Sequence, residues 1–306
     1  MMPSRVIRVG LMGLGFFRIS SQNPKLGAVI ASVECGSIGK KLSTMPQATA
    51  PRVLVMRAPG TNCDRETAFA FELAGATASR HTLLEVRQNP AMLRDFQILA
   101  MPGGFSYGDD AGAGAIWAAE LRHFLADELR AFRDRGNLIL GICNGFQALV
   151  RTGLLVPPDD EGPVVSLTRN TSGRYIDRWV HLAVCPGNNK FLQGIDRLHV
   201  PMAHGEGRFV TREAWQLEGL DQAGQLSLRY ATQGGDVAAQ DDVQNNPNGS
   251  CGAVAGLSDA TGQVLGMMPH PERHVLPTQN PHWTRLGLAQ KPDGLRIFEN
   301  AVKSFA

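Results

Sequence analysis

The stretch Leu138-Ile-Leu-Gly-Ile-Cys-Asn-Gly-Phe-Gln147 decides the fold of this chain. A short apolar run leads into Gly141-Ile-Cys-Asn-Gly145, and a helical pattern follows at once. Glycines two residues before and two residues after the cysteine let a strand turn sharply into a helix, where a side chain would clash. The pattern therefore predicts a nucleophile elbow, with Cys143 exposed and strained at the bend.

A thiol at this bend has the setting of a nucleophile. The free backbone N–H groups and the positive end of the dipole at a helix N-terminus stabilise a thiolate. The alternative is a packed, inert thiol at the end of a buried strand, which is the usual state of a free cysteine. Because both flanking glycines are present, the sequence favours Cys143 as a nucleophile.

A cysteine nucleophile requires a base, and the base requires an orienting group. Two of the eight histidines lie in His-x-Glu pairs, His204 with Glu206 and His270 with Glu272. In an extended chain both side chains of such a pair point to the same side, so either pair could form a base with its carboxylate. Prolines on both sides of His270 restrict its backbone, whereas His204 precedes the flexible Gly205. Rigidity favours His270 as the base and leaves the His204 pair as the alternative.

Outside the elbow, short apolar runs alternate with helical patterns, which is typical of an α/β protein with a mostly parallel sheet flanked by helices. Residues 138–142 form a predicted strand that places Cys143 at its C-terminal end, where such folds bind ligands. A stripe of apolar residues at steps of three and four predicts one helix through residues 117–132. Segments 253–257 and 263–267 predict a C-terminal β-hairpin that delivers His270.

The composition is that of a globular protein and argues against several classes of function. With 306 residues, of which 43% are hydrophobic, the chain can bury a large core. A net charge of +2 does not indicate a nucleic acid or a membrane as partner, and no apolar run approaches the roughly 20 residues of a membrane span. The five cysteines are an odd number without a C-x-x-C pair, so we expect neither a disulfide framework nor a metal site.

Three motifs resemble the class I glutamine amidotransferases: Gly141-Ile-Cys-Asn-Gly-Phe-Gln147, Pro102-Gly-Gly-Phe-Ser-Tyr-Gly-Asp109 and Gly266-Met-Met-Pro-His-Pro-Glu-Arg273. The second and third narrow the resemblance to the glutaminase subunits of phosphoribosylformylglycinamidine synthases, which are cytoplasmic enzymes of purine biosynthesis. The resemblance extends from about residue 51 to the C-terminus. It implies the flavodoxin-like architecture of that superfamily.

The resemblance also implies a role for each residue of the elbow and its surroundings. Cys143 would attack the side-chain carbonyl carbon of L-glutamine, His270 would take and return the proton, and Glu272 would orient His270. The backbone N–H groups of Gly104 and Asn144 would form the oxyanion hole.

Further residues complete the expected site. Gln147, one helical turn after the nucleophile, matches the family position that contacts the glutamine substrate. For His204 and Glu206 we expect a role at a subunit interface or in shaping the glutamine pocket.

The resemblance further implies partners for this chain. The ammonia would pass to a separate synthetase subunit, which uses ATP to form formylglycinamidine ribonucleotide, and a small accessory subunit would belong to the same enzyme. The chain itself would need no cofactor, since ATP and Mg²⁺ would bind to the synthetase. Two alternatives are a stand-alone cysteine hydrolase or peptidase of the same superfamily and a non-catalytic partner of the synthetase. The presence of Cys143, His270 and Glu272 together disfavours a non-catalytic partner.

Residues 1–50 precede the region of resemblance. They contain six basic residues and one acidic residue, Glu34. The pair Gly13 and Gly15 after an apolar run imitates a dinucleotide-binding fingerprint, but Arg18 stands at its third glycine position and no full βαβ unit follows. A basic, serine-containing leader is also a pattern of targeting segments. We interpret residues 1–50 as a disordered extension translated from an upstream start and residues 51–306 as the glutamine amidotransferase domain.

Overall fold

The computed structural model describes residues 50–288 and 291–306. The interpretation of the N-terminal extension and its incomplete fingerprint falls on residues 1–49, which lie outside the described residues. No helix within the two described ranges is long and apolar enough to cross a membrane.

The described residues form a mixed, largely parallel sheet with the strand order β2-β1-β3-β4-β11-β10-β9-β6-β7. The first five of these strands are parallel neighbours, and the pairs from β11 to β7 are antiparallel. A small antiparallel sheet pairs β5 with β8. The strands are β1 Arg52–Arg57, β2 Thr77–Thr82, β3 Ile98–Met101, β4 Leu138–Ile142, β5 Val165–Arg169, β6 Ile176–Val184, β7 Arg197–His204, β8 Glu206–Thr211, β9 Leu228–Ala231, β10 Val254–Ser258 and β11 Val264–Met267.

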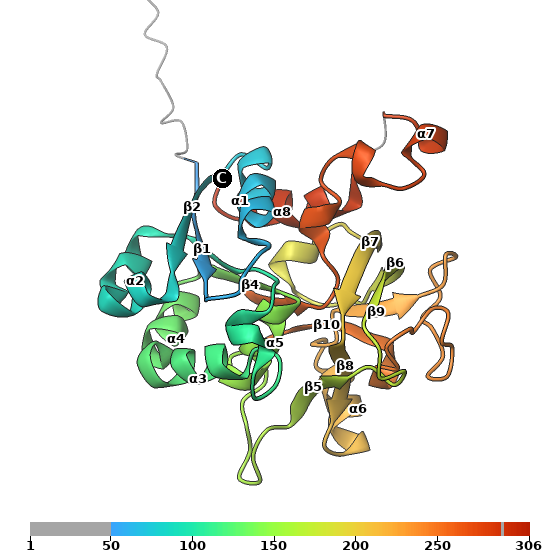
Figure 1. Cartoon of the computed structure of the whole chain (residues 1–306), viewed down its shortest axis with the longest axis horizontal. Coiled ribbons are helices and arrows are strands. Elements are labelled where there is room, and N and C mark those ends of the chain that lie inside the picture. The colour runs from blue at the N-terminus through green and yellow to red at the C-terminus, as the bar shows by residue number, and fades with distance from the viewer. Residues whose placement is uncertain (1–49, 289–290) are drawn as a thin grey trace, which may run out of the picture. The chain divides into compact units, whose positions relative to one another are not determined.

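Helices cover both faces of the parallel part of the sheet. Helices α1 and α8 pack against each other on one side of β1 and β4, and α3, α4 and α5 form a group on the other side (Figure 1). The helices are α1 Asp64–Leu73, α2 Leu83–Gln88, α3 Ala115–Phe124, α4 Ala126–Asp134, α5 Asn144–Thr152, α6 Ala214–Gln222, α7 Trp283–Leu286 and α8 Asp293–Lys303.

The core lies between these helices and the central strands β3 and β4. Every residue of these two strands is buried. Strands that are covered on both faces need continuous apolar runs, which explains why the run at residues 138–142 predicted the position of β4. The prediction of a single helix through residues 117–132 is wrong, because the chain forms two helices, α3 and α4, with a break at Leu125. The backbone of Leu125 leaves the helical region (φ −134°, ψ 11°), although hydrogen bonds from Leu125 to Leu121 and from Leu129 to Leu125 span the break.

The predicted C-terminal hairpin is confirmed. Strands β10 and β11 pair in antiparallel register, with Gly256 opposite Met267 and Ser258 opposite Leu265. Strand β11 also pairs in parallel with β4, with Met267 beside Ile142. The segment that follows β11 therefore leaves the sheet at the same edge as the segment that follows β4, and this arrangement brings His270 to Cys143.

Candidate active site

Cys143 lies at the bend between β4 and α5, as the glycine pattern predicts. Its backbone has φ 50° and ψ −106°, an unusual conformation for a residue other than glycine. A Cβ atom at Gly145 would lie 1.9 Å from the carbonyl oxygen of Met101, and one at Gly141 would lie 2.5 Å from Leu149. The backbone contact therefore requires glycine at position 145, whereas a side chain at position 141 would have to displace the buried side chain of Leu149.

The thiol of Cys143 is buried rather than exposed, because other elements close over the bend. Its side chain is 5% accessible, and Sγ donates a weak hydrogen bond to the carbonyl oxygen of Ala203 at the end of β7 (3.7 Å). The expectation of an exposed thiol considered only the local turn, whereas β7 comes from a distant part of the chain.

His270 and Glu272 form a buried pair beside this thiol. His270 Nδ1 lies 2.6 Å from Glu272 Oε1, and the two side chains are at most 2% accessible. With Nδ1–H donating to the carboxylate, Nε2 faces the thiols; it has no hydrogen-bond partner within the described residues. Burial lowers the pKa of His270, but Glu272 and the thiols of Cys143 and Cys63 together outweigh burial and hold the pKa well above its usual range.

The loop after β3 lies next to the elbow. A Cβ atom at Gly103 would lie 2.7 Å from His270 Cε1 and 3.4 Å from Cys143 Cβ. Gly104 has φ 148°, and a Cβ atom added there would lie 2.8 Å from the backbone atoms of both Thr61 and Asn62. The two glycines therefore let the backbone of this loop approach the site more closely than any residue with a side chain could.

The side chain of Asn144 ties this loop to the elbow. Asn144 Oδ1 accepts from the backbone N–H of Ser106 (3.0 Å), and Nδ2 donates to Asp109 Oδ1 (2.9 Å). Asn144 Nδ2 also donates to Gln147 Oε1 (2.9 Å), while Gln147 Nε2 donates to the carbonyl oxygen of Glu206. The amide of Gln147, which we expected to contact the substrate, is thus engaged at both ends by the protein in this structure.

His204 and Glu206 do not form a base with its carboxylate. His204 is buried, with 3% of its surface accessible, and its Nδ1 lies 3.1 Å from Asn170 Oδ1. Burial, assisted by the charge of His270, lowers the pKa of His204 to about 3. Glu206 points elsewhere, since Oε2 accepts from the backbone N–H of Ala113 (3.1 Å).

Sequence reasoning missed Cys63 as a neighbour of the site. Cys63 follows β1, and its backbone N–H donates to the carbonyl oxygen of Gly103 (3.2 Å). Its sulfur accepts from Arg273 Nη2 (3.1 Å), and burial raises its pKa more than contacts with His270 and Arg273 lower it. Cys63 and Arg273 are 210 residues apart in the chain, so local spacing carries no signal of this contact.

Tyr175 is a second residue that the sequence did not indicate. Its side chain is 53% accessible, and its ring centroid lies 6.4 Å from that of Phe105 in the loop after Gly104. Burial raises the pKa of Tyr175, and the charge of Cys143 adds to this effect. Tyr175 and Phe105 thus lie at the outer side of the site, within electrostatic reach of the thiol.

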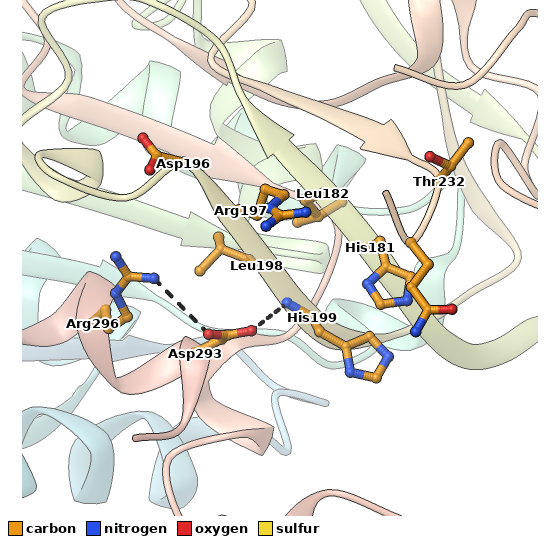
Figure 2. Close-up of a pocket in the computed structure, with 10 residues that line it drawn as sticks. His181, Leu182, Asp196, Arg197, Leu198, His199, Thr232, Asp293 and Arg296 are labelled. Atoms are coloured by element: carbon orange, nitrogen blue, oxygen red, sulfur yellow. Dashed lines mark hydrogen bonds and ion pairs between the residues drawn. The ribbon is translucent and has the colours of Figure 1, made fainter. Parts of the chain in front are cut away.

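A separate cavity of about 420 Å³ lies between β6, β7 and the start of α8 (Figure 2). His181 and His199 stack across the two strands with ring centroids 4.2 Å apart. Asp293 accepts from the backbone N–H of His199 (2.8 Å) and lies 4.0 Å from Arg296. None of the residues that line this cavity belongs to the set around Cys143.

The comparisons with known proteins agree on one family. Residues 50–305 match the family described as a CobB/CobQ-like glutamine amidotransferase domain. The phosphoribosylformylglycinamidine synthase subunit PurQ of Dehalococcoides mccartyi is 46% identical over 253 residues, which are 82% of this chain and 96% of that protein. The PurQ subunit of Methanococcus maripaludis is 39% identical over 267 residues, which are 83% of this chain and 97% of that protein.

A solved structure gives the same result. A chain in the structure of PurLQS from Thermotoga maritima is similar with a TM-score of 0.63 and 32% sequence identity, and the match covers 83% of this chain and 99% of that one. The chain therefore belongs to the CobB/CobQ-like glutamine amidotransferase family and, within it, to the PurQ subunits of phosphoribosylformylglycinamidine synthase.

Proposed function

We propose that this chain is the glutaminase subunit of phosphoribosylformylglycinamidine synthase and that Cys143, His270 and Glu272 carry out its chemistry. The membership in the PurQ subunits supports the activity. The observation that supports the residues is the buried Nδ1–Oε1 contact of 2.6 Å, which leaves Nε2 of His270 directed at the thiols. A nucleophile, a base and an orienting carboxylate are the three parts that acyl transfer by a cysteine requires.

In the first half of the reaction, Cys143 Sγ attacks the side-chain amide carbon of glutamine, and its proton moves to His270 Nε2. The carbon–sulfur bond forms while the carbonyl electron pair moves onto the oxygen. The tetrahedral intermediate then collapses, the carbon–nitrogen bond breaks, and His270 returns the proton to the leaving nitrogen. The raised pKa of His270 suits this role, because the imidazole must hold the proton between the two steps.

In the second half, water attacks the γ-glutamyl thioester. His270 takes a proton from the water, the carbon–sulfur bond breaks, and the proton passes to the departing thiolate. The products are glutamate and a free Cys143. Glu272 accepts from Nδ1–H throughout and stabilises the imidazolium, since its Oε1 lies 2.6 Å from Nδ1.

The oxyanion of both intermediates would be stabilised by the backbone N–H groups of Gly104 and Asn144. Asn144 directly follows the nucleophile at the N-terminus of α5, and the loop of Gly104 is held beside the elbow through Ser106. We assign Gln147 to the glutamine pocket; it would position the wall formed by Glu206, whose carbonyl it contacts. His204 would line the same pocket as a neutral group.

The proposed architecture is flavodoxin-like. The parallel strands have the order β2-β1-β3-β4-β11, which corresponds to the order 2-1-3-4-5 of that doubly wound fold. In such sheets ligands bind beyond the C-terminal ends of the strands, where Cys143 and the Gly104 loop lie. The β10–β11 hairpin would add the catalytic histidine to this edge.

We infer that the partners are the PurL synthetase and the small PurS subunit, because the similar Thermotoga maritima chain was solved in PurLQS. Ammonia made at Cys143 would pass to PurL. ATP and Mg²⁺ would bind there, and the present chain would act in the cytoplasm without a cofactor of its own.

The test of the proposed nucleophile is modification of the full chain with a glutamine-directed electrophile. We expect one adduct, on Cys143, and loss of glutamine hydrolysis in proportion to labelling. The Cys143→Ala variant should take up no label, whereas Cys185→Ser should label as the wild type does. An adduct on Cys63 would refute the assignment of the nucleophile.

A further inference from the structure

Arg273 marks the side on which the buried active site reaches the surface. Its Nη2 contacts the buried Cys63 Sγ (3.1 Å), while its own side chain is 37% accessible. Its Nε lies 4.0 Å from Glu66 Oε1 on α1. Any protein that covers the accessible side of the site must therefore also meet α1 and the chain segment that follows Arg273.

The exposed face of α1 is apolar next to this point. Residues three and four apart lie on one face of a helix, so Phe69 and Leu73 extend the face on which Glu66 meets Arg273. Both side chains are exposed. The opposite face of α1 is already satisfied, since Phe71 packs edge-on against Phe298 of α8 (ring centroids 4.9 Å apart). Phe69 and Leu73 thus add nothing to the core.

The segment after Arg273 carries a second exposed apolar group, which consists of Leu276, Trp283 and Leu286. Figure 1 shows α7, which contains Trp283, standing away from the sheet. The segment is nonetheless held by its own hydrogen bonds, because Gln279 Oε1 accepts from the backbone N–H groups of Val275 (2.7 Å) and Leu276 (2.8 Å). An ordered arm with apolar side chains at its surface therefore begins directly after the catalytic motif.

The distribution of exposed apolar side chains favours this side of the molecule. Thirteen large hydrophobic side chains are exposed in the described residues. Two lie on α1, two are Phe105 and Tyr175, and four lie between residues 276 and 288, so eight of the thirteen are on segments that line or directly follow the site. Single exposed apolar residues are ordinary, but a group of them marks a surface for another molecule.

We propose that the PurL synthetase docks on this apolar rim, which consists of Phe69 and Leu73 on one flank of Arg273 and Leu276, Trp283 and Leu286 on the other. The inference rests on the proposed function, because ammonia made at Cys143 must leave toward the subunit that consumes it. A second copy of this chain on the rim would block the side from which PurL has to approach.

The charges beside the rim indicate what the facing surface of PurL is like. Arg65 on α1 and Arg285 in α7 are both exposed next to the apolar side chains. Interfaces commonly have an apolar centre and a polar edge with complementary charge. We therefore expect PurL to present an apolar patch bordered by carboxylates.

The first measurement is the concentration of the full chain that half-saturates amidine formation by PurL and PurS with glutamine, ATP and Mg²⁺. Trp283→Ala should raise this concentration by at least about 10-fold, as expected for a central aromatic anchor. Leu73→Glu should raise it by at least about 10-fold, because docking would bury an unpaired charge. The isolated variants should unfold at the wild-type temperature and release glutamate at the rate of the isolated wild type.

Each variant has a matched control outside the rim. Trp215 on α6 is 66% accessible, compared with 39% for Trp283, and Leu84 on α2 is 57% accessible, compared with 44% for Leu73. Trp215→Ala and Leu84→Glu should keep the wild-type half-saturating concentration. The inference would be overturned by wild-type behaviour of Trp283→Ala or Leu73→Glu, or by an equal loss in either control.

The second measurement identifies the occupant by photo-cross-linking within the assembled complex. Benzoylphenylalanine in place of Trp283 should form a covalent adduct with PurL, and the same probe in place of Trp215 should not. An adduct of the Trp283 probe with PurS alone, or with a second copy of this chain, would contradict the inference. A wild-type chain that neither associates with PurL nor supports amidine formation from glutamine would instead contradict the proposed function.

Discussion

At the scale of single residues, the backbone of Cys143 shows how the thiol is held at the end of β4. Positive φ is unfavourable for a residue with a Cβ atom, and such a conformation costs about 1–3 kcal/mol. The surrounding packing maintains it, since Gly145 lies against Met101 and the N–H of Cys143 donates to Met267 (2.8 Å). The strain belongs to Cys143 itself and not to the two glycines of the elbow.

This strain predicts a difference between two inactive variants. Cys143→Gly and Cys143→Ala both remove the thiol, but only glycine adopts φ 50° without strain. Cys143→Gly should therefore exceed Cys143→Ala in free energy of unfolding by about 1 kcal/mol. Chemical denaturation of both variants measures this difference, and an alanine variant as stable as the glycine variant would show that the bend is not strained.

The two candidate bases can be separated by their variants. Removal of a general base typically lowers the rate by about 10² to 10⁴, and we expect a loss of this size in kcat for His270→Ala. His204→Asn should lose much less, because His204 stays neutral down to about pH 3 and asparagine can keep the contact with Asn170. Steady-state glutamate release by the two variants provides the comparison. A greater loss in His204→Asn would reverse the assignment.

At the scale of elements, the site is assembled from the ends of β3, β4 and β11. Gly103, in the loop after β3, determines how closely this loop can approach His270 and Cys143. An added Cβ would meet His270, Cys63 and Cys143 at 2.7 to 3.4 Å. Gly103→Ala should displace the imidazole and slow glutamine hydrolysis by about 10²-fold, because catalysis is sensitive to shifts of about 1 Å. Gly219→Ala in α6, where a Cβ meets nothing within 4 Å, is the control and should keep full activity. Wild-type kcat in Gly103→Ala would contradict the arrangement of the loop.

The elements that the sequence predicted are those with local patterns. The continuous apolar run at residues 138–142 predicted β4, and the two apolar segments on either side of residues 258–262 predicted the β10–β11 hairpin. The break at Leu125 was not predictable, because the apolar stripe continues unchanged through it. The proximity of Cys63 was also missed, since it depends on how β1 and the segment after β11 end at one edge of the sheet.

At the scale of the whole molecule, the fold brings together residues from the beginning, middle and end of the described chain. Cys63 follows β1, Cys143 follows β4, and His270 follows β11, and these strands belong to one parallel array. From motifs alone, the sequence indicated Cys143 as a candidate nucleophile and His270 with Glu272 as its candidate partners. It could not indicate Asn170, Ala203 or Tyr175, because the contacts that bring such residues to the site join distant parts of the chain; Ala203 and Cys143, for example, are 60 residues apart.

The proposed role of Cys143 is to supply ammonia from glutamine to the synthetase. The most direct test follows glutamate release and amidine formation together in the complex with PurL and PurS, with either glutamine or ammonium chloride as the nitrogen source. We predict that the wild type releases glutamate as it forms amidine from glutamine. The Cys143→Ala complex should release no glutamate and form no amidine from glutamine, but should still form amidine from ammonium chloride. Glutamate release by the Cys143→Ala complex at the wild-type rate would show that Cys143 is not the nucleophile.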